Sequence, residues 1–231
     1  MPQQTELPLG KRGLLELVVD ACYFADMQSS KDQRWIVGVT GASGIRYAVR
    51  LLQVLPSLVD EVHVVISESA LRVLSDEEGI SIGQSSLSYE RLCSSQASNV
   101  TFYNPKDIGA RIASGSMVTN GMVVIPCSMA TLGALAHGVP THLVHRAADV
   151  VMKEGRKLIV VPRETPLSPI HLENMLTLSR YGVRVLPAMP AFYSQPKTID
   201  DLINHMVMKV LDTMGIPNSL VGRWKEPSGE E

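Results

Sequence analysis

The chain has 231 residues, 45% hydrophobic and 19% charged, a composition typical of a globular protein with a sizeable core. A net charge of -2 and an aromatic content of 5% argue against a nucleic-acid surface, an anionic-membrane surface and a base-stacking platform. The three cysteines form no C-x-x-C pair, and no apolar run reaches the length of a membrane span. These features predict a cytoplasmic protein in reducing surroundings.

The first 33 residues predict an N-terminal extension that carries one helix. Apolar residues recur at three- and four-residue steps between Gly13 and Met27, which is the spacing of an amphipathic helix. We expect this helix to pack on the main domain or on a neighbouring subunit. Residues 34–224 are expected to form a single domain, and residues 225–231 a short charged tail.

Short apolar runs alternate with amphipathic segments along residues 34–224. Six of these runs predict strands: 35–40, 61–67, 100–103, 122–125, 158–161 and 183–186. Strands that alternate with helices pair in parallel through right-handed crossovers. The sequence therefore predicts an α/β fold, a three-layer α/β/α sandwich around a parallel, Rossmann- or flavodoxin-like sheet.

Small residues follow three predicted strands at the point where each strand ends. The turn 41–43 (Gly-Ala-Ser) follows the first strand, Ser67 ends the second, and residues 128–131 open the helix after a later strand. Ligands of parallel sheets bind beyond the carboxyl ends of the strands, and helix N-termini attract anions. These turns therefore favour a phosphate or a planar ring, although GVTGASG alone is equally typical of NAD(P)-binding reductases.

The segment 146–175 predicts a helix, a strand, a turn and a second helix. Gly155 is expected to end the first helix, and the second is expected to begin at Pro169 with Ser168 as its N-cap. Arg163 and Glu164 stand between them, at the carboxyl end of the strand. A cation and an acid at this position could bind an anionic ligand and exchange a proton with it. The alternative interpretation is that Arg163 and Glu164 form an ion pair that only stabilises the loop.

The run RAADVVMKEGRKLIVVPRETPLSPIHLENML, which begins at Arg146, resembles the signature of the flavin prenyltransferase family, the UbiX/Pad1 group. The resemblance extends from about Ile36 to Trp224 and includes GVTGASG, PCSMATLGALAHG, PAMPAFYSQP and LDTMGIPNSLVGRW in that order. It implies that the dimethylallyl group of dimethylallyl phosphate is joined to reduced FMN without a metal. The product, prenylated FMN, would serve a UbiD-type decarboxylase.

The resemblance also implies the site residues. It places FMN against small residues at three strand ends and one arginine: Gly41, Ala42, Ser43, Ser67, Ser128, Met129, Ala130, Thr131 and Arg146. It places the prenyl phosphate against five larger side chains: Lys153, Arg163, Glu164, Tyr193 and Lys209. The implied catalytic group is Glu164 as proton exchanger, with Ser43 in the relay and with Arg163 and Lys153 on the phosphate. A large homo-oligomer such as a dodecamer, with sites between subunits, is implied as well.

Two positions depart from the family pattern. Gly155 replaces an arginine that often follows Lys-Glu in the family, and it is expected to shorten the helix. Thr141 and His142 stand where an asparagine often precedes the leucine that leads into Arg146, so they are expected to change how the flavin edge or a subunit contact is held. His142 and His145 could share a helix face, but no carboxylate or cysteine completes a recognisable metal site.

Three alternatives stay open from the sequence. A short-chain reductase would use Tyr193 and Lys197 on one helix face, but Pro196 lies between them and conflicts with a helix there. A flavin-dependent cysteine-type decarboxylase of related fold would share the flavin site without needing the cationic side chains. A non-catalytic flavin-binding subunit is supported only by the departures at Gly155 and Thr141.

Overall fold

The structure is a computed structural model of the chain, and it describes residues 33–223. The helix predicted at 13–27, Trp224 and the tail 225–231 lie outside the described residues. Within residues 33–223, no helix is both long and apolar enough to cross a lipid bilayer.

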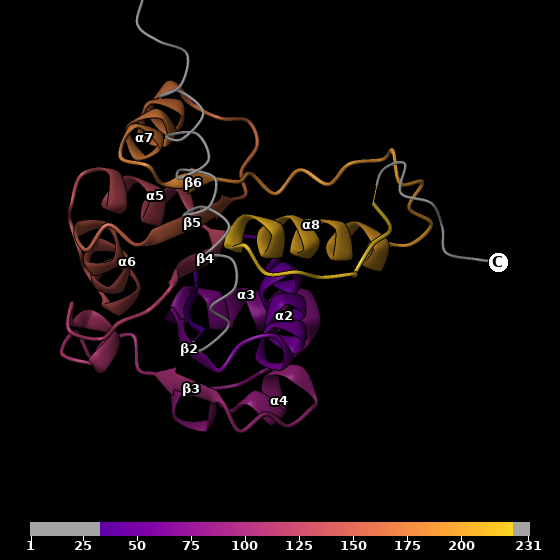
Figure 1. Ribbon diagram of the computed structural model, residues 1–231, viewed down its shortest axis with the longest axis horizontal. Coiled ribbons are helices and arrows are strands. Elements are labelled where there is room, and N and C mark those ends of the chain that lie inside the picture. The colour runs from indigo at the N-terminus through magenta and orange to yellow at the C-terminus, as the bar shows by residue number, and fades with distance from the viewer. Residues whose placement is uncertain (1–32, 224–231) are drawn as a thin grey trace, which may run out of the picture. The chain divides into compact units, whose positions relative to one another are not determined.

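A six-stranded, all-parallel sheet forms the centre of the described domain, in the order β3-β2-β1-β4-β5-β6 (Figure 1). Its strands are β1 (Arg34–Val39), β2 (Glu61–Ile66), β3 (Val100–Tyr103), β4 (Gly121–Cys127), β5 (Lys157–Pro162) and β6 (Arg184–Val185). The four longest strands are buried over almost their whole length, because both faces of the sheet are covered. The chain order reverses between β1 and β4, which is where open parallel sheets bind ligands.

Helices form a layer on each face of the sheet and confirm the predicted three-layer sandwich. One layer contains α2 (Ile45–Val54), α3 (Glu68–Glu78), α4 (Tyr89–Cys93) and α8 (Ile199–Met214). The other contains α5 (Met129–Ala136), α6 (Leu143–Lys153) and α7 (Pro169–Arg180). Three short 3-10 turns complete the described elements: η1 (Leu55–Ser57), η2 (Gln84–Ser86) and η3 (Arg111–Ala113).

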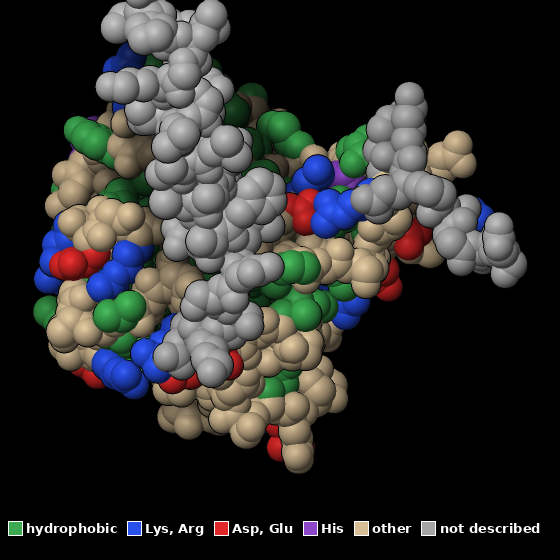
Figure 2. Space-filling view, in the orientation of Figure 1, with side chains coloured by type: hydrophobic (Ala, Val, Ile, Leu, Met, Phe, Trp, Pro, Cys, Tyr) green, Lys and Arg blue, Asp and Glu red, His purple; other side chains and the backbone are tan. Residues whose placement is uncertain are grey.

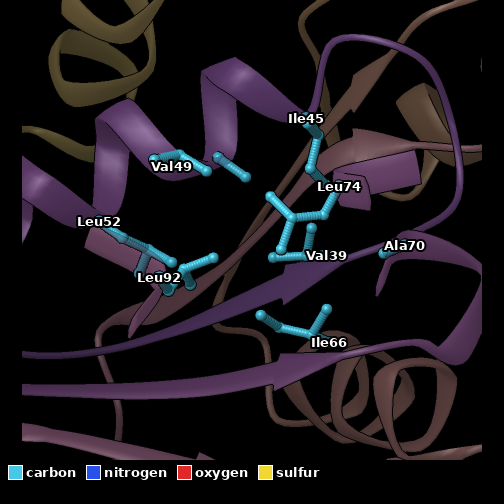
Figure 3. Close-up of a pocket in the computed structure, with 9 residues that line it drawn as sticks. Val39, Ile45, Val49, Leu52, Ile66, Ala70, Leu74 and Leu92 are labelled. Carbon is cyan, nitrogen blue, oxygen red and sulfur yellow. The ribbon is translucent and has the colours of Figure 1, made fainter. Parts of the chain in front are cut away.

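The core between α2, α3 and α4 contains one small gap of about 10 Å³ (Figure 3). Its lining is wholly apolar and comes from these helices and from β1 and β2: Val39, Ile45, Ala48, Val49, Leu52, Ile66, Ala70, Leu74 and Leu92. A gap of this size barely reaches the volume that one water molecule needs. It is therefore a packing imperfection and not a ligand site.

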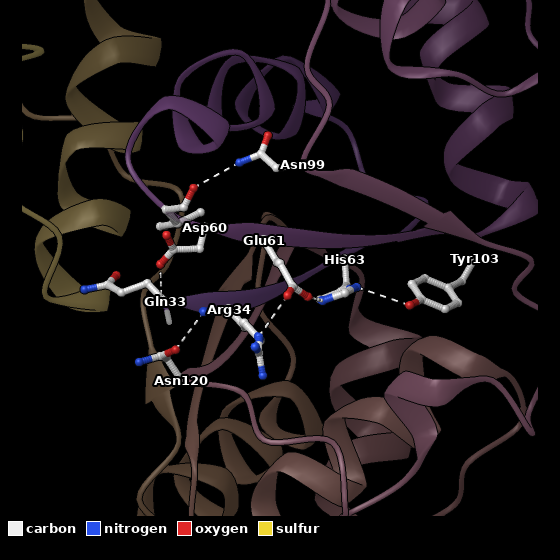
Figure 4. Close-up of polar contacts among 9 residues, drawn as sticks. Gln33, Arg34, Asp60, Glu61, His63, Asn99, Tyr103 and Asn120 are labelled. Atoms are coloured by element: carbon white, nitrogen blue, oxygen red, sulfur yellow. Dashed lines mark hydrogen bonds and ion pairs between the residues drawn. The ribbon is translucent and has the colours of Figure 1, made fainter. Parts of the chain in front are cut away.

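A buried histidine ties the first three strands together through polar contacts (Figure 4). His63 is 3% exposed, and its Nε2 lies 3.1 Å from Glu61 while its Nδ1 lies 3.2 Å from the hydroxyl of Tyr103. The Nε of Arg34 donates to the same Glu61 carboxylate over 3.0 Å. Burial lowers the pKa of His63 even though the Glu61 carboxylate opposes that shift. The side chains of this network use one another as hydrogen-bond partners, so we assign the network a structural role.

Two differences from the predicted bounds have a clear physical cause. The sequence predicts that the strand at 122–125 closes at Pro126, but β4 continues to Cys127 through a register shift against β5. That irregularity accommodates a residue with no N–H to donate, and the carbonyl of Pro126 accepts from Thr40. The helix predicted from Arg146 begins three residues earlier, because Leu143 and Val144 are fully buried in the core.

The surface of the described domain mixes charges of both signs, as Figure 2 shows on one face. Apolar side chains also remain exposed on α7. Leu172 and Leu176, one helical turn apart, are 53% and 51% exposed, and Ile170 is 66% exposed. A single copy of the chain therefore presents an apolar helix surface to solvent.

Candidate functional site

The turn after β1 lies at the point where the strand order reverses. Its Gly41 packs against the start of α3, since a Cβ at this position would lie 2.5 Å from the Cβ of Ser69. Just before it, Thr40 accepts from the backbone N–H of Ser128 and donates to the carbonyl of Pro126, each over 2.8 Å. Thr40 thus joins the carboxyl ends of β1 and β4. Sequence reasoning missed it, because the predicted strand 35–40 included Thr40 as its last residue.

Two of the predicted serines cap helices that begin at this edge of the sheet. The Oγ of Ser67 accepts from the N–H of Ala70 over 3.1 Å, and the Oγ of Ser128 accepts from the N–H of Thr131 over 3.2 Å. Ser128 also donates to the hydroxyl of Thr131, which is 3% exposed. Met129 is half-buried in the first turn of α5, where backbone N–H groups have no intrahelical partner.

The N-terminus of α2 is filled by a carboxylate of the chain itself. Glu77 accepts from the N–H of Gly44 over 2.9 Å and from the N–H of Ile45 over 3.1 Å. A negative side chain there complements the positive end of the helix. Glu68 adds another carboxylate to the first turn of α3, whereas the first turn of α5 has none. Of the three helix starts, α5 therefore fits an anionic phosphate best.

Arg163 connects the ends of β5 and β1. Its Nε donates to the carbonyl of Ser43 over 3.1 Å, while the side chain of Ser43 and the neighbouring Glu164 are exposed. No ion pair joins Arg163 to Glu164 in residues 33–223, so the interpretation of a loop-stapling pair is wrong. The Glu164 carboxylate instead accepts from the N–H of Thr165 over 2.9 Å.

A pocket of about 280 Å³ opens beside Arg163 and Glu164, at the carboxyl ends of β5 and β6. Its lining comes from the two strand-end loops and from α7: Pro162, Arg163, Glu164, Thr165, Leu167, Met175, Pro187, Ala188 and Met189. One cation and one acid therefore face an otherwise largely apolar recess. This combination can bind an anion beside an apolar wall.

The start of α7 fixes one side of this pocket. Ser168 accepts from the N–H of His171, and the Nδ1 of His171 accepts from the N–H of Ser168, both over 3.3 Å. This reciprocal capping box, with Pro169 at the first helical position, confirms the predicted helix start. His171 is therefore part of the helix cap.

A buried histidine, His145, contacts Thr131, one of the predicted FMN-binding residues. His145 is 6% exposed, its Nε2 lies 3.2 Å from the hydroxyl of Thr131, and its Nδ1 lies 3.0 Å from the hydroxyl of Thr141. Burial, together with the ring of His142 at 3.8 Å, lowers the pKa of His145 to about 4. An uncharged His145 therefore holds Thr131 at neutral pH. No cluster of three metal-ligating side chains occurs among residues 33–223.

Arg146 lies one residue further along α6 and is partly exposed. Its guanidinium pairs with Asp149 over 2.7 Å, one turn along the same helix. Arg146 lies in the first turn of α6, directly after His145, which contacts Thr131 at the start of α5. Within residues 33–223, no hydrogen bond or ion pair joins Arg146 to the predicted FMN residues of α5.

Tyr193 and Lys209 belong to the C-terminal segment. The Oη of Tyr193 lies 3.3 Å from the Nε2 of His205, and Lys209 follows His205 by one turn of α8. Tyr193 and Lys197 both precede Ile199, the first residue of α8, so they do not share a helix face. The geometry of the short-chain reductase alternative is therefore absent.

Tyr193 and Lys209 do not line the pocket beside Arg163. Lys153 also lies away from this pocket in one copy of the chain. It ends α6, pairs with Glu154 and lies next to Gly115 in the loop before β4. Arg156 donates to the carbonyl of the same Gly115 over 2.7 Å, which places this group at the amino ends of β4 and β5. Arg163 follows the carboxyl end of β5, so the two cations lie at opposite edges of the sheet.

Comparisons with known proteins agree with this geometry. A model of the flavoprotein family matches residues 24–211. Flavin prenyltransferase UbiX of Halalkalibacterium halodurans is 47% identical over 192 residues, which cover 83% of this chain and 93% of that protein. A dodecameric FMN-dependent UbiX-like decarboxylase from Escherichia coli O157:H7 is 47% identical, with a TM-score of 0.74 over 84% of this chain and all of that chain.

Two further solved structures separate the alternatives. AnUbiX (PadA1), in complex with FMN and dimethylallyl pyrophosphate, is 38% identical with a TM-score of 0.76, covering 85% of this chain and 99% of that chain. The peptidyl-cysteine decarboxylase EpiD is only 16% identical with a TM-score of 0.52, so that likeness concerns the fold alone. The chain therefore belongs to the flavoprotein family and, within it, to the UbiX-type flavin prenyltransferases.

Proposed function

We propose that the protein transfers the dimethylallyl group of dimethylallyl phosphate to reduced FMN and releases inorganic phosphate. The allylic C–O bond breaks, its electron pair leaves with the phosphate, and the five-carbon group becomes bonded to the flavin. Reduced FMN supplies the electron-rich ring that accepts this group. The observation that carries the proposal is the pocket lined by Arg163 and Glu164, together with the hydrogen bond from Arg163 to the Ser43 turn.

The reaction makes two demands that this pocket can meet. A departing phosphate needs positive charge and hydrogen-bond donors, and Arg163 offers a planar set of both. The carbocation-like fragment needs apolar surroundings that exclude water, and Leu167 and Met175 would contribute apolar lining. We assign the proton exchange to Glu164, with Ser43 as the next group in the relay.

FMN would lie across the reversal point between β1 and β4. We assign it to the turn 41–43, to Ser67, to residues 128–131 and to Arg146. Support comes from the hydroxyl groups that gather there and from Gly41, whose missing side chain permits the close packing of the turn. The N-terminus of α5 is the proposed place for the negatively charged phosphate of FMN.

The remaining phosphate ligands would come from Tyr193, Lys209 and a second copy of the chain. Lys153 lies at the amino edge of its own sheet, so we propose that it reaches the pocket of a neighbouring copy. The dodecameric relative and the exposed Leu172 and Leu176 of α7 support an assembly of copies. The site would then be complete only in the homo-oligomer.

We also propose that a UbiD-type decarboxylase uses the prenylated FMN and that the protein acts in the cytoplasm. The first assignment follows from the family resemblance. The second rests on cysteine usage, since Cys93 and Cys127 are buried free thiols.

One incubation tests the proposed function. The protein is mixed anaerobically with reduced FMN and dimethylallyl phosphate, and the flavin is then weighed by mass spectrometry. We expect a five-carbon adduct together with released phosphate, and a parallel incubation with the diphosphate measures donor selectivity. An unchanged flavin mass would contradict the proposal, and decarboxylation of a cysteine-ending peptide would instead support the related decarboxylases.

A further inference from the structure

His205 is a buried histidine that none of the assigned roles uses. It lies in the middle of α8 with 3% of its surface exposed. Its Nδ1 is 3.5 Å from the backbone nitrogen of Ala191, and its Nε2 is 3.3 Å from the Oη of Tyr193. The two rings meet edge to face, with centroids 5.7 Å apart and an interplanar angle of 81°. Both ring nitrogens therefore face the loop that carries Tyr193.

The contact with Ala191 decides the tautomer of this histidine. A backbone N–H can only donate, so the Nδ1 of His205 must be the acceptor. Burial, and then the positive charge of Lys209, lower the pKa of His205, which favours the neutral ring. A neutral ring with an unprotonated Nδ1 carries its hydrogen on Nε2. The Nε2–H therefore donates to the hydroxyl oxygen of Tyr193.

We propose that His205 is a positioning residue that fixes the hydroxyl of Tyr193 as a hydrogen-bond donor toward the phosphate of the allylic substrate. A hydroxyl whose oxygen accepts from a fixed N–H directs its own hydrogen to another acceptor. Tyr193 is 45% exposed, so burial alone does not hold its ring. This inference rests on the proposed function, because that function supplies the phosphate.

A packing role alone does not account for these contacts. A buried imidazole loses water at both nitrogens, and this loss is offset only when each nitrogen finds a partner. An apolar side chain would fill the same position on α8 without that requirement. Both partners of His205, Ala191 and Tyr193, come from one short stretch of loop. The histidine therefore determines the conformation of that stretch.

The test is a double-mutant cycle between His205 and Tyr193. We expect His205→Phe to raise the KM for dimethylallyl phosphate about tenfold, the effect of one hydrogen bond, with a smaller change in kcat. His205→Gln can donate and accept in the same directions, so it should recover most of this loss. In a Tyr193→Phe background, His205→Phe should add no further change. Equal KM values for wild type and His205→Phe, or additive effects in the double variant, would overturn the proposal.

A binding measurement keeps this test independent of turnover. Calorimetric titration of the FMN-loaded protein with inorganic phosphate should show about tenfold weaker binding for His205→Phe, with recovery in His205→Gln. Asn204→Ala is the matched control, because Asn204 lies on the same helix but contacts Arg50. Unchanged phosphate affinity in His205→Phe would reject the role of His205. A wild-type protein that forms no flavin adduct would reject only the proposed reaction.

Discussion

Arg163 is the side chain that joins the loops at the carboxyl ends of β5 and β1. Its Nε is used by the carbonyl of Ser43, and its remaining N–H groups can serve the pocket that it lines. Arg163→Lys keeps the charge but loses the planar set of donors. We expect the KM for dimethylallyl phosphate to rise about tenfold while FMN affinity is unchanged, as measured by steady-state kinetics and flavin titration. An equal loss of FMN affinity would show that Arg163 acts on the flavin instead.

Glu164 tests the assigned proton transfer. The Glu164→Gln side chain keeps the size of the residue and can still accept from the N–H of Thr165, but it cannot exchange a proton at neutral pH. We expect FMN binding to stay intact and adduct formation to slow by about 100-fold or more in anaerobic single-turnover experiments. Glu173→Gln, on an exposed position of α7 outside the pocket lining, is the control. A Glu164→Gln protein that turns over like wild type would show that the proton role is wrong.

The sequence located the strand-end residues but not their partners. The turn 41–43 and the Arg163 loop could be predicted because small residues and a charge pair interrupt apolar runs. Thr40, Glu77 and His205 were missed because hydrophobic spacing does not reveal polar partners, which lie 88 residues apart for Thr40 and Ser128 and 12 for His205 and Tyr193. Which loops become neighbours depends on the order of the strands in the sheet, and hydrophobic periodicity does not contain that order.

At the scale of the elements, the contact between α5 and α6 makes stability depend on pH. The pKa of His145 is lowered to about 4 from an ordinary value of 6.5. Below pH 6.5, His145 is protonated in the unfolded chain, but in the folded chain it stays uncharged until the pH approaches 4. The stabilisation is therefore complete above pH 6.5 and is lost as the pH falls toward 4, with a loss on the order of 2 kcal/mol at pH 5.

Thermal unfolding at pH 7.5 and pH 5 measures this effect. We expect the wild-type Tm to fall at the lower pH, and His145→Gln to show a smaller fall because glutamine does not titrate. Replacing His137, an exposed histidine at the C-terminus of α5, by glutamine is the matched control and should leave the pH dependence unchanged. Equal pH dependence in wild type and His145→Gln would assign the effect to other groups.

The elements themselves were largely predictable for a physical reason. Strands covered on both faces are largely apolar, so β2 differs from its predicted run by one residue at its end and β5 by one residue at each end. The helix 199–214 was predictable with its observed bounds, because its apolar residues recur at three- and four-residue steps. The start of α6 was not, because burial of Leu143 and Val144 depends on tertiary contacts that a residue pattern does not show.

At the scale of the whole molecule, the separation of Lys153 from Glu164 predicts complementation. Lys153→Ala and Glu164→Gln proteins are each expected to be impaired. If each site combines residues of two copies, mixed oligomers formed from both proteins should regain activity at up to about one quarter of their sites. Activity of the mixture is measured after dissociation and reassembly, with each variant reassembled alone as the control. No recovery in verified mixed oligomers would place both residues on one chain.

The strand order also has a consequence for how the chain is made. β1, β2 and β3 leave the ribosome first, but α5, α6 and α7, which cover one face of these strands, all follow β4. The 88 residues between Thr40 and Ser128 take roughly 4 to 18 s to translate. Through that interval the nascent sheet has an uncovered apolar face that includes Ile36 and Val65. Chaperones that shield apolar surface would act on this chain before its ligand crevice exists.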